Sequence, residues 1–181
     1  MKIIDFLNSI GIRTKYCSYP IKGFLPNVFI SAGVLYYTED TLPSDILHEA
    51  GHIAIIPEEY RAFCTGDMEK CVQTIWAKAK AAGELEEIDG YMCRALLQAS
   101  DVEATAWAWA AGKFLEIPEA EIILDSQYEG NGKNIRFMLS TNSYFGINGL
   151  RAARMLKSVR EYPVLQKWTQ KQNQSIVQDS I

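Results

Sequence analysis

The chain begins with apolar residues at helical spacing, which predicts a short helix over residues 2–10 that ends at Gly11. The segments 12–18 and 26–38 are instead rich in β-branched and aromatic residues. Ala32-Gly33 divides the second segment into two halves, which is typical of a β-hairpin. We therefore expect a small, mostly antiparallel sheet of about three strands near the N-terminus.

Helical patterns dominate the rest of the chain. Thr41 is a candidate cap for a helix that tolerates Pro43 in its first turn and stops before Pro57. The other apolar patterns predict a loop over 116–132 and helices over 67–82, 88–115, 133–141 and 148–159. The expected fold class is therefore α+β, with one domain over 1–169 and a polar tail over 170–181.

Composition narrows the class of protein. The 181 residues are 48% hydrophobic and carry a net charge of −4, which fits one globular domain and argues against a direct nucleic-acid binder. No apolar run approaches the ~18 residues of a membrane span, and the N-terminus lacks the features of a signal peptide. Four cysteines without a C-x-x-C pair indicate free thiols, so we expect a cytoplasmic protein.

The chemistry of the chain is concentrated in one short motif. Its two histidines, His48 and His52, stand in His-Glu-Ala-Gly-His, an H-E-x-x-H motif on a predicted helix. Residues four apart share a helix face, so both imidazoles can reach one cation. Glu49 lies beside that face, where it can act on water without being a ligand. The motif predicts a zinc site with Glu49 as general base, and the alternative is a helix whose two histidines are solvated or line the core.

A catalytic zinc site usually has three protein ligands, and the chain has no third histidine. The first candidate is Glu103, because an ionised carboxylate in its strongly apolar helix is costly unless it is paired or metal-bound. Asp101 is the second candidate, either as a ligand or as an acceptor for an imidazole N–H. Asp45 competes for that acceptor role. Glu58 stands where the longer metzincin motif has its third histidine, but Ile55 replaces the glycine of that motif.

Three segments together resemble the ImmA/IrrE family of zinc metallo-endopeptidases. The family's H-E-x-G-H is matched by residues 48–52, and its E-A-N-x-F-A followed by L-x-x-P is similar to residues 103–108 and 114–118. Residues 144–148, Tyr-Phe-Gly-Ile-Asn, are similar to the family's F-x-V-S segment. The resemblance covers about residues 1–160.

The resemblance implies a zincin-like fold and a zinc-dependent endopeptidase. By analogy, His48, His52 and Glu103 hold the metal and Glu49 is the catalytic carboxylate. Members of the family often cleave or bind helix-turn-helix repressors, so the resemblance also implies a protein substrate of that regulatory kind.

The chain departs from the family in two ways. Thr105 replaces the usual Asn and Trp107 replaces Phe. Residues 61–95 also lengthen the gap between the two metal-site motifs, which weakens the assignment of Glu103 because a long insertion moves the register. This insertion is a candidate lid or partner surface.

Hydrolysis also needs a donor for the developing oxyanion, for which Tyr144, Tyr60 and Arg151 are candidates. The strand at 34–38 could form the edge of the cleft, to which an extended peptide adds. We expect the four tryptophans to pack in the core rather than to stack on bases. A peptide deformylase is disfavoured, because no glycine precedes Cys17 as that motif requires.

Two function classes remain. The first is an active zinc endopeptidase with a specific protein substrate. The second is a metal-containing protein that holds a regulatory partner without hydrolysis. Glu49 favours the first class, because a pure binding protein needs no base beside the metal.

Overall fold

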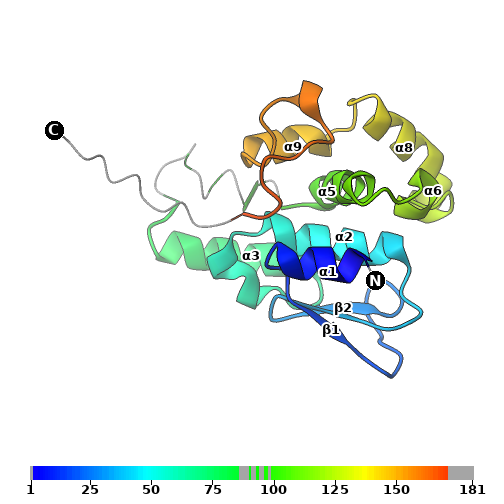
Figure 1. Cartoon of the computed structure of the whole chain (residues 1–181). Coiled ribbons are helices and arrows are strands. Elements are labelled where there is room, and N and C mark those ends of the chain that lie inside the picture. Colours follow the sequence, from blue (N-terminus) through cyan, green and yellow to red (C-terminus); the bar gives the residue numbers. More distant parts are fainter. Residues whose placement is uncertain (1, 86–89, 91–92, 94–95, 98, 171–181) are drawn as a thin grey trace.

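The structure is a computed structural model that describes residues 2–85, 90, 93, 96–97 and 99–170. It has the expected α+β fold, in which a small sheet near the N-terminus is followed by a mainly helical region (Figure 1). Within these ranges, no helix is long and apolar enough to cross a membrane.

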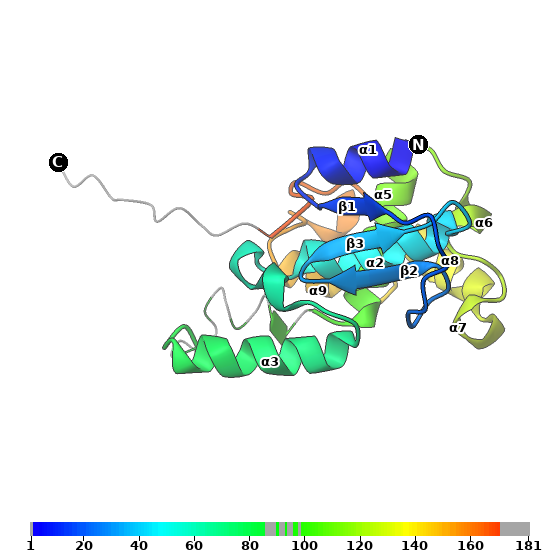
Figure 2. The same ribbon diagram turned by 90° about the horizontal axis from the view of Figure 1, so that it is seen from below.

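The sheet follows the first helix. Helix α1 (Lys2–Ser9) leads to β1 (Thr14–Tyr16), and a longer connection then leads to β2 (Val28–Ser31) and β3 (Val34–Tyr37). The strand order is β1-β3-β2, with β2 antiparallel and β1 parallel to β3. Figure 2 looks onto this sheet, with α1 beside β1 and α2 behind the strands. The sheet is therefore mixed rather than mostly antiparallel, because the connection over 17–27 is long enough to bring β2 to the other side of β3.

The predicted hairpin is confirmed. Its turn residues Ala32 and Gly33 have φ values of 48° and 69°, as a two-residue turn between twisted strands requires. The hairpin also makes β3 the central strand, so the expectation that residues 34–38 form a free cleft edge is wrong. The outer edge of β2 is partly covered as well, because Gly66 N–H donates to Ile30 O at 3.0 Å.

Helix α2 (Pro43–Ile55) matches the predicted motif helix, but its cap differs. Leu42 is the N-cap residue and makes no side-chain cap bond. The Thr41 hydroxyl instead donates to Asn27 O at 2.7 Å and accepts from Thr38 N–H at 2.9 Å. Thr41 therefore ties the start of α2 to the preceding loop and is not its cap.

The remaining helices follow the pattern only in part, and two short helices, over 119–122 and 127–130, interrupt the loop expected over 116–132. The predicted helix over 67–82 is confirmed, whereas the segment 88–115 is not one helix: residues 96 and 97 are helical, residues 99 and 100 are not, and α5 begins at residue 101. Much of 86–98 lies outside the described residues. The expected helix over 148–159 begins earlier and ends at 152, shortly before Arg154 takes a φ of 56°. The segments are η1 (Glu58–Phe63), α3 (Met68–Ala81), α5 (Asp101–Phe114), α6 (Glu119–Ile122), α7 (Gln127–Gly130), α8 (Gly132–Ser140), α9 (Gly146–Ala152) and η2 (Val159–Glu161).

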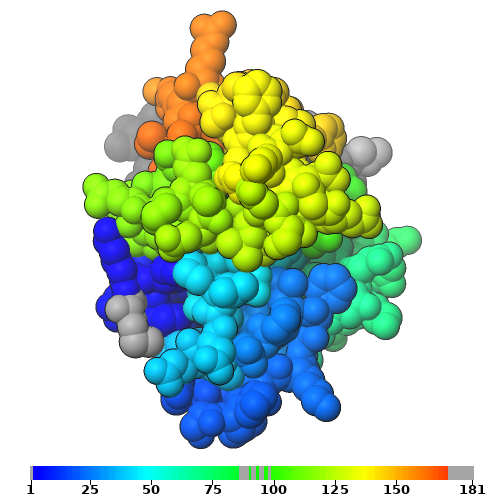
Figure 3. All heavy atoms as spheres, turned by 90° about the vertical axis from the view of Figure 1, so that its right-hand side faces the viewer, coloured from blue at the N-terminus to red at the C-terminus, as the bar shows by residue number. Residues whose placement is uncertain are grey.

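Helices α2 and α5 form the centre of the molecule. Figure 1 shows α2 between the sheet and α5, with α8 and α9 covering the other side of α5. Figure 3 shows the same division in space-filling form, with the sheet and α2 in one half and the segments after α5 in the other.

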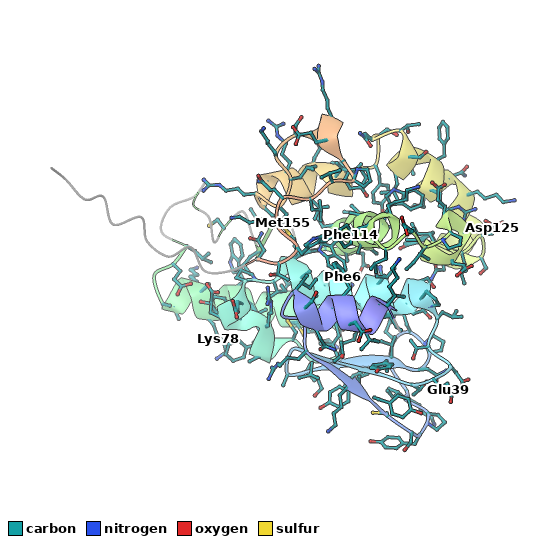
Figure 4. The ribbon with its side chains drawn as sticks, viewed as in Figure 1. Phe6, Glu39, Lys78, Phe114, Asp125 and Met155 are labelled. Carbon is teal, nitrogen blue, oxygen red and sulfur yellow. The ribbon has the colours of Figure 1, made fainter. Side chains whose placement is uncertain are left out.

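Aromatic side chains hold α1 against α5. Phe6 and Phe114 face each other with ring centroids 5.4 Å apart (Figure 4). Trp107 and Trp109 are buried, and Trp107 Nε1 donates to the carbonyl of Trp168 at 2.8 Å. These three tryptophans therefore act in packing, as the sequence predicts.

Candidate metal centre

Helix α2 places both histidines of its motif on one face. The Nε2 atoms of His48 and His52 lie 3.2 Å apart, and their rings are nearly perpendicular, at 89°. Their side chains are 16% and 5% exposed. The one-turn spacing predicted from the sequence thus brings two imidazole nitrogens to one point.

Asp101, in the first turn of α5, is the third member of this group. Its Oδ1 atom lies 3.1 Å from His52 Nε2 and 3.8 Å from His48 Nε2. Two ligand atoms that are each ~2.1 Å from a tetrahedral zinc ion lie about 3.4 Å from each other. Among the described residues, this His/His/Asp group could hold a metal ion, and its separations fit zinc.

A glycine in the motif allows α2 and α5 to approach closely. A Cβ atom on Gly51 would lie 2.6 Å from the backbone oxygen of Ala104, a distance that real Cβ contacts do not show. Position 51 must therefore be glycine for α2 and α5 to pack this closely. The close approach brings the first turn of α5 to the imidazoles.

The charge states of the group suit a cation. Burial lowers the pKa of His52, which favours the neutral imidazole that binds metal. Hydrogen bonds from His48 and His52 hold the pKa of Asp101 well below its usual range, so its carboxylate is ionised. An exposed carboxylate thus completes a site whose two nitrogen donors are largely buried.

The other ring nitrogens are not held as expected. In the described structure, the Nδ1 atoms of His48 and His52 are buried without a hydrogen-bond partner. Asp45, expected as a candidate acceptor, is buried and accepts from Ser44 at 3.2 Å and from Gln127 at 3.0 Å. Asp45 therefore ties α2 to the 124–130 segment instead of orienting an imidazole.

Glu49 has the environment of an acid–base group. It is 8% exposed, and burial raises its pKa to about 7, while Asp101 and Asp45 contribute further repulsion. Such a carboxyl can both accept and release a proton near neutral pH. The residue type and position came from the motif, whereas the burial that raises the pKa comes from the fold.

Glu103 lies outside the group formed by the two histidines and Asp101. Its side chain is 2% exposed and accepts a hydrogen bond from the hydroxyl of Ser100. A Cβ atom on Gly149 would lie 2.2 Å from Glu103 Oε1, so the carboxyl packs closely against α9. Burial raises the pKa of this carboxyl.

The local sequence explains this placement. Ser100 is the N-cap residue of α5 and Glu103 is its third residue, which is the Ser-x-x-Glu pattern of a capping box, but the Ser100 hydroxyl donates to the Glu103 carboxyl and does not cap the helix backbone. The bond from Ser100 turns Glu103 back toward the start of α5 and leaves Asp101, at the first helical position, free to face α2. This signature was readable in the sequence and would have favoured Asp101 as the ligand.

The structure also places the remaining candidate ligand and the three candidate donors for the oxyanion. Glu58 is exposed in η1 and is outside the His/His/Asp group. The Tyr60 hydroxyl donates to Glu84 Oε2 at 2.9 Å, and Arg151 is exposed on α9. Tyr144 is buried, and this burial raises its pKa, with a smaller contribution from the charges of Glu103 and Asp101, so it is near the start of α5.

Tyr128 is a residue that the sequence analysis did not single out. Its hydroxyl lies 2.7 Å from Thr105 Oγ1, and burial raises its pKa to about 12 with contributions from Asp101 and Asp45. Its backbone has a φ of 54°, which is unusual for a residue with a side chain. Nothing in the local pattern of an expected loop could have placed this hydroxyl beside α5.

The comparisons with known proteins give no relative. No protein-family model, curated protein or solved structure matches the chain. The functional argument therefore rests on the geometry of the candidate metal centre and on the motif that forms it.

Proposed function

We propose that this chain is a zinc-dependent endopeptidase that hydrolyses a specific protein substrate. The observation that carries the proposal is the convergence of His48 Nε2, His52 Nε2 and Asp101 Oδ1 beside the buried carboxyl of Glu49. The same four residues belong to a helix motif and a helix start that can form a zinc peptidase centre.

The two imidazoles and the Asp101 carboxylate would hold the metal. Two nitrogen ligands and one carboxylate oxygen are the donor set of several catalytic zinc sites, and they leave a fourth position open. Zinc in such a site supplies Lewis acidity and activates water near neutral pH. The exposure of Asp101, whose side chain is 80% accessible, leaves this side of the centre open to substrate.

Glu49 would transfer the proton. Its position next to His48 places it beside the ligand face without making it a ligand, and its pKa of about 7 lets it take a proton from water and return it to the leaving amine. This role is what separates the peptidase from the alternative, a metal-containing protein that holds a regulatory partner without hydrolysis.

We further propose that the substrate is a regulatory protein, of which a helix-turn-helix repressor is the first candidate. The support for this is the ImmA/IrrE-like sequence of residues 48–52. We propose a cytoplasmic location for the reaction, on the basis of the free thiols of the chain.

The test combines metal analysis with one conservative variant. Protein purified without chelators should contain about one zinc ion per chain. Glu49→Gln should keep that zinc and lower turnover of a cleaved protein by about 10² or more. The variant should also retain substrate from an extract of the source cells, which can then be sequenced. A protein that neither retains nor rebinds zinc contradicts the proposal, and turnover unchanged in Glu49→Gln contradicts the assigned base.

A further inference from the structure

A pocket of about 660 Å³ opens directly beside the candidate metal centre. His52 and Asp101 form part of its wall, and Leu96, Ala99 and Ser100 also line it. Apart from Leu97, the remaining lining residues belong to α3, which is part of the 61–95 insertion and runs beyond the β2 side of the sheet (Figure 2). The insertion therefore contributes to the same cavity as the metal ligands.

The α3 wall is apolar. Met68, Val72 and Trp76 recur every four residues, so they share one face of the helix. All three are only half-buried, although they are apolar residues. Two polar residues of α3 also line the pocket, and Gln73 Nε2 donates to Glu69 Oε1 at 3.4 Å. The pocket thus combines an apolar wall with a negatively charged margin.

We infer that this pocket receives a large apolar side chain of the substrate, next to the peptide bond that is cut. The inference rests on the proposed function and adds the substrate class. A group that fills the pocket can touch Trp76 as well as His52 and Asp101, so it lies beside the candidate metal centre. The carboxylate of Glu69 disfavours an acidic side chain at this position.

The size of the pocket agrees with this occupant. Pockets that enclose small ligands typically have volumes of about 300–1,000 Å³, so 660 Å³ holds a leucine or phenylalanine side chain together with neighbouring backbone. A large apolar side chain can bury its surface against the half-buried Trp76, whereas a small or charged side chain buries less apolar area there. The apolar lining therefore favours substrates with a large apolar side chain at this position.

The experiment measures peptide binding separately from hydrolysis. Fluorescent decapeptides that differ only at one central residue (Leu, Phe, Ala or Asp) are titrated by anisotropy into Glu49→Gln protein, with zinc and after removal of zinc. Val72→Trp, which fills the pocket, and Val72→Glu, which charges its wall, are added to this background. Ala77→Trp and Ala77→Glu are the matched controls, because Ala77 is exposed on the same helix and does not line the pocket.

We expect the Leu and Phe peptides to bind at least about tenfold more tightly than the Asp peptide, the scale at which apolar pockets discriminate. Both Val72 variants should lose this preference while keeping the zinc content of the parent, and both Ala77 controls should retain it. Equal binding of all peptides, binding of none, or a preference that survives both Val72 variants overturns the inference. If the purified protein neither contains nor takes up zinc and still shows the Val72-dependent preference, the proposed peptidase is contradicted and the pocket assignment stands.

Discussion

Replacing Asp101 by asparagine tests the third ligand of the candidate metal centre. The carboxylate lies 3.1 and 3.8 Å from the two Nε2 atoms, and asparagine keeps its shape while removing its charge. Because the Asp101 side chain is 80% exposed, its contacts with the two imidazoles contribute little to the stability of metal-free protein. The stability effect of Asp101→Asn should therefore appear only when zinc is present.

The magnitude follows from linkage between binding and folding. Zinc at 100 times its dissociation constant stabilises the folded chain by about 2.7 kcal/mol. Loss of a residue that only supports a metal ligand weakens metal binding by up to about 100-fold, so we take about 100-fold for the loss of the Asp101 charge. At the same zinc concentration, the stabilisation then falls to about 0.4 kcal/mol. For a protein of this size, the difference of about 2.3 kcal/mol lowers the melting temperature by roughly 5–9 °C.

Glu103 provides the contrasting variants. Glu103→Gln keeps an acceptor for the Ser100 hydroxyl and should retain zinc. Glu103→Ala removes the partner of the Ser100 hydroxyl and leaves a cavity beside Gly149, so it should lower the melting temperature equally with and without zinc.

Melting curves and zinc titrations of these variants, each with and without a chelator, decide between the two carboxylates. If Glu103→Gln loses zinc while Asp101→Asn holds it as tightly as the parent, the assignment of Asp101 is refuted and Glu103 is the ligand.

Three further predictions concern packing, charge and substrate range. Gly51→Ala should lower stability by about 1–3 kcal/mol and weaken zinc binding, because its Cβ would meet Ala104 O at 2.6 Å; unchanged melting and zinc affinity would show that α2 and α5 can separate without cost. In metal-free protein, the folded state raises the pKa of Glu49 from 4.5 to about 7, so the folded chain binds more protons than the unfolded chain and stability should fall as pH rises through this window. Glu49→Gln should reduce this decrease in the free energy of unfolding by up to about 3 kcal/mol, which denaturant curves at pH 5 and pH 8 can measure. An equal decrease in the parent and in the variant would contradict the argument that burial raises the pKa of Glu49. Casein should be cut slowly or not at all by zinc-loaded protein, and fast digestion on a gel would argue against a specific regulatory substrate.

Local signals explain which parts of the fold were predictable. The hairpin follows from Ala32-Gly33 between β-branched and aromatic residues, and α2 follows from its apolar spacing and from the prolines at its ends. The parallel pairing of β1 was not predictable in this way, because it depends on how the connection over 17–27 passes around β3.

The residues of the candidate metal centre also differ in how far the sequence predicts their positions. His48 and His52 were predictable because a single helix fixes their separation. The third candidate ligand depends on where α5 begins, and a helix assumed to run continuously over 88–115 hides the helix start at Ser100. With the start at Ser100, Asp101 and Glu103 point in different directions, and only the docking of α5 between α2 and α9 determines which carboxylate meets the imidazoles.

Residues 61–95, the expected insertion, separate the helix motif from the first turn of α5 in the sequence. The contacts that set the position of α5 lie outside the insertion: Gly51 packs on Ala104, and Gly146 and Gly149 pack on Val102 and Glu103. Each of these glycines allows backbone or a buried carboxyl to come closer than any side chain would permit. Because α2 and α9 thus hold the first turn of α5 from two sides, the insertion can vary without moving Asp101. Its helix α3 is therefore free to shape the pocket beside the centre, which separates the residues that would perform the reaction from those that would select the substrate.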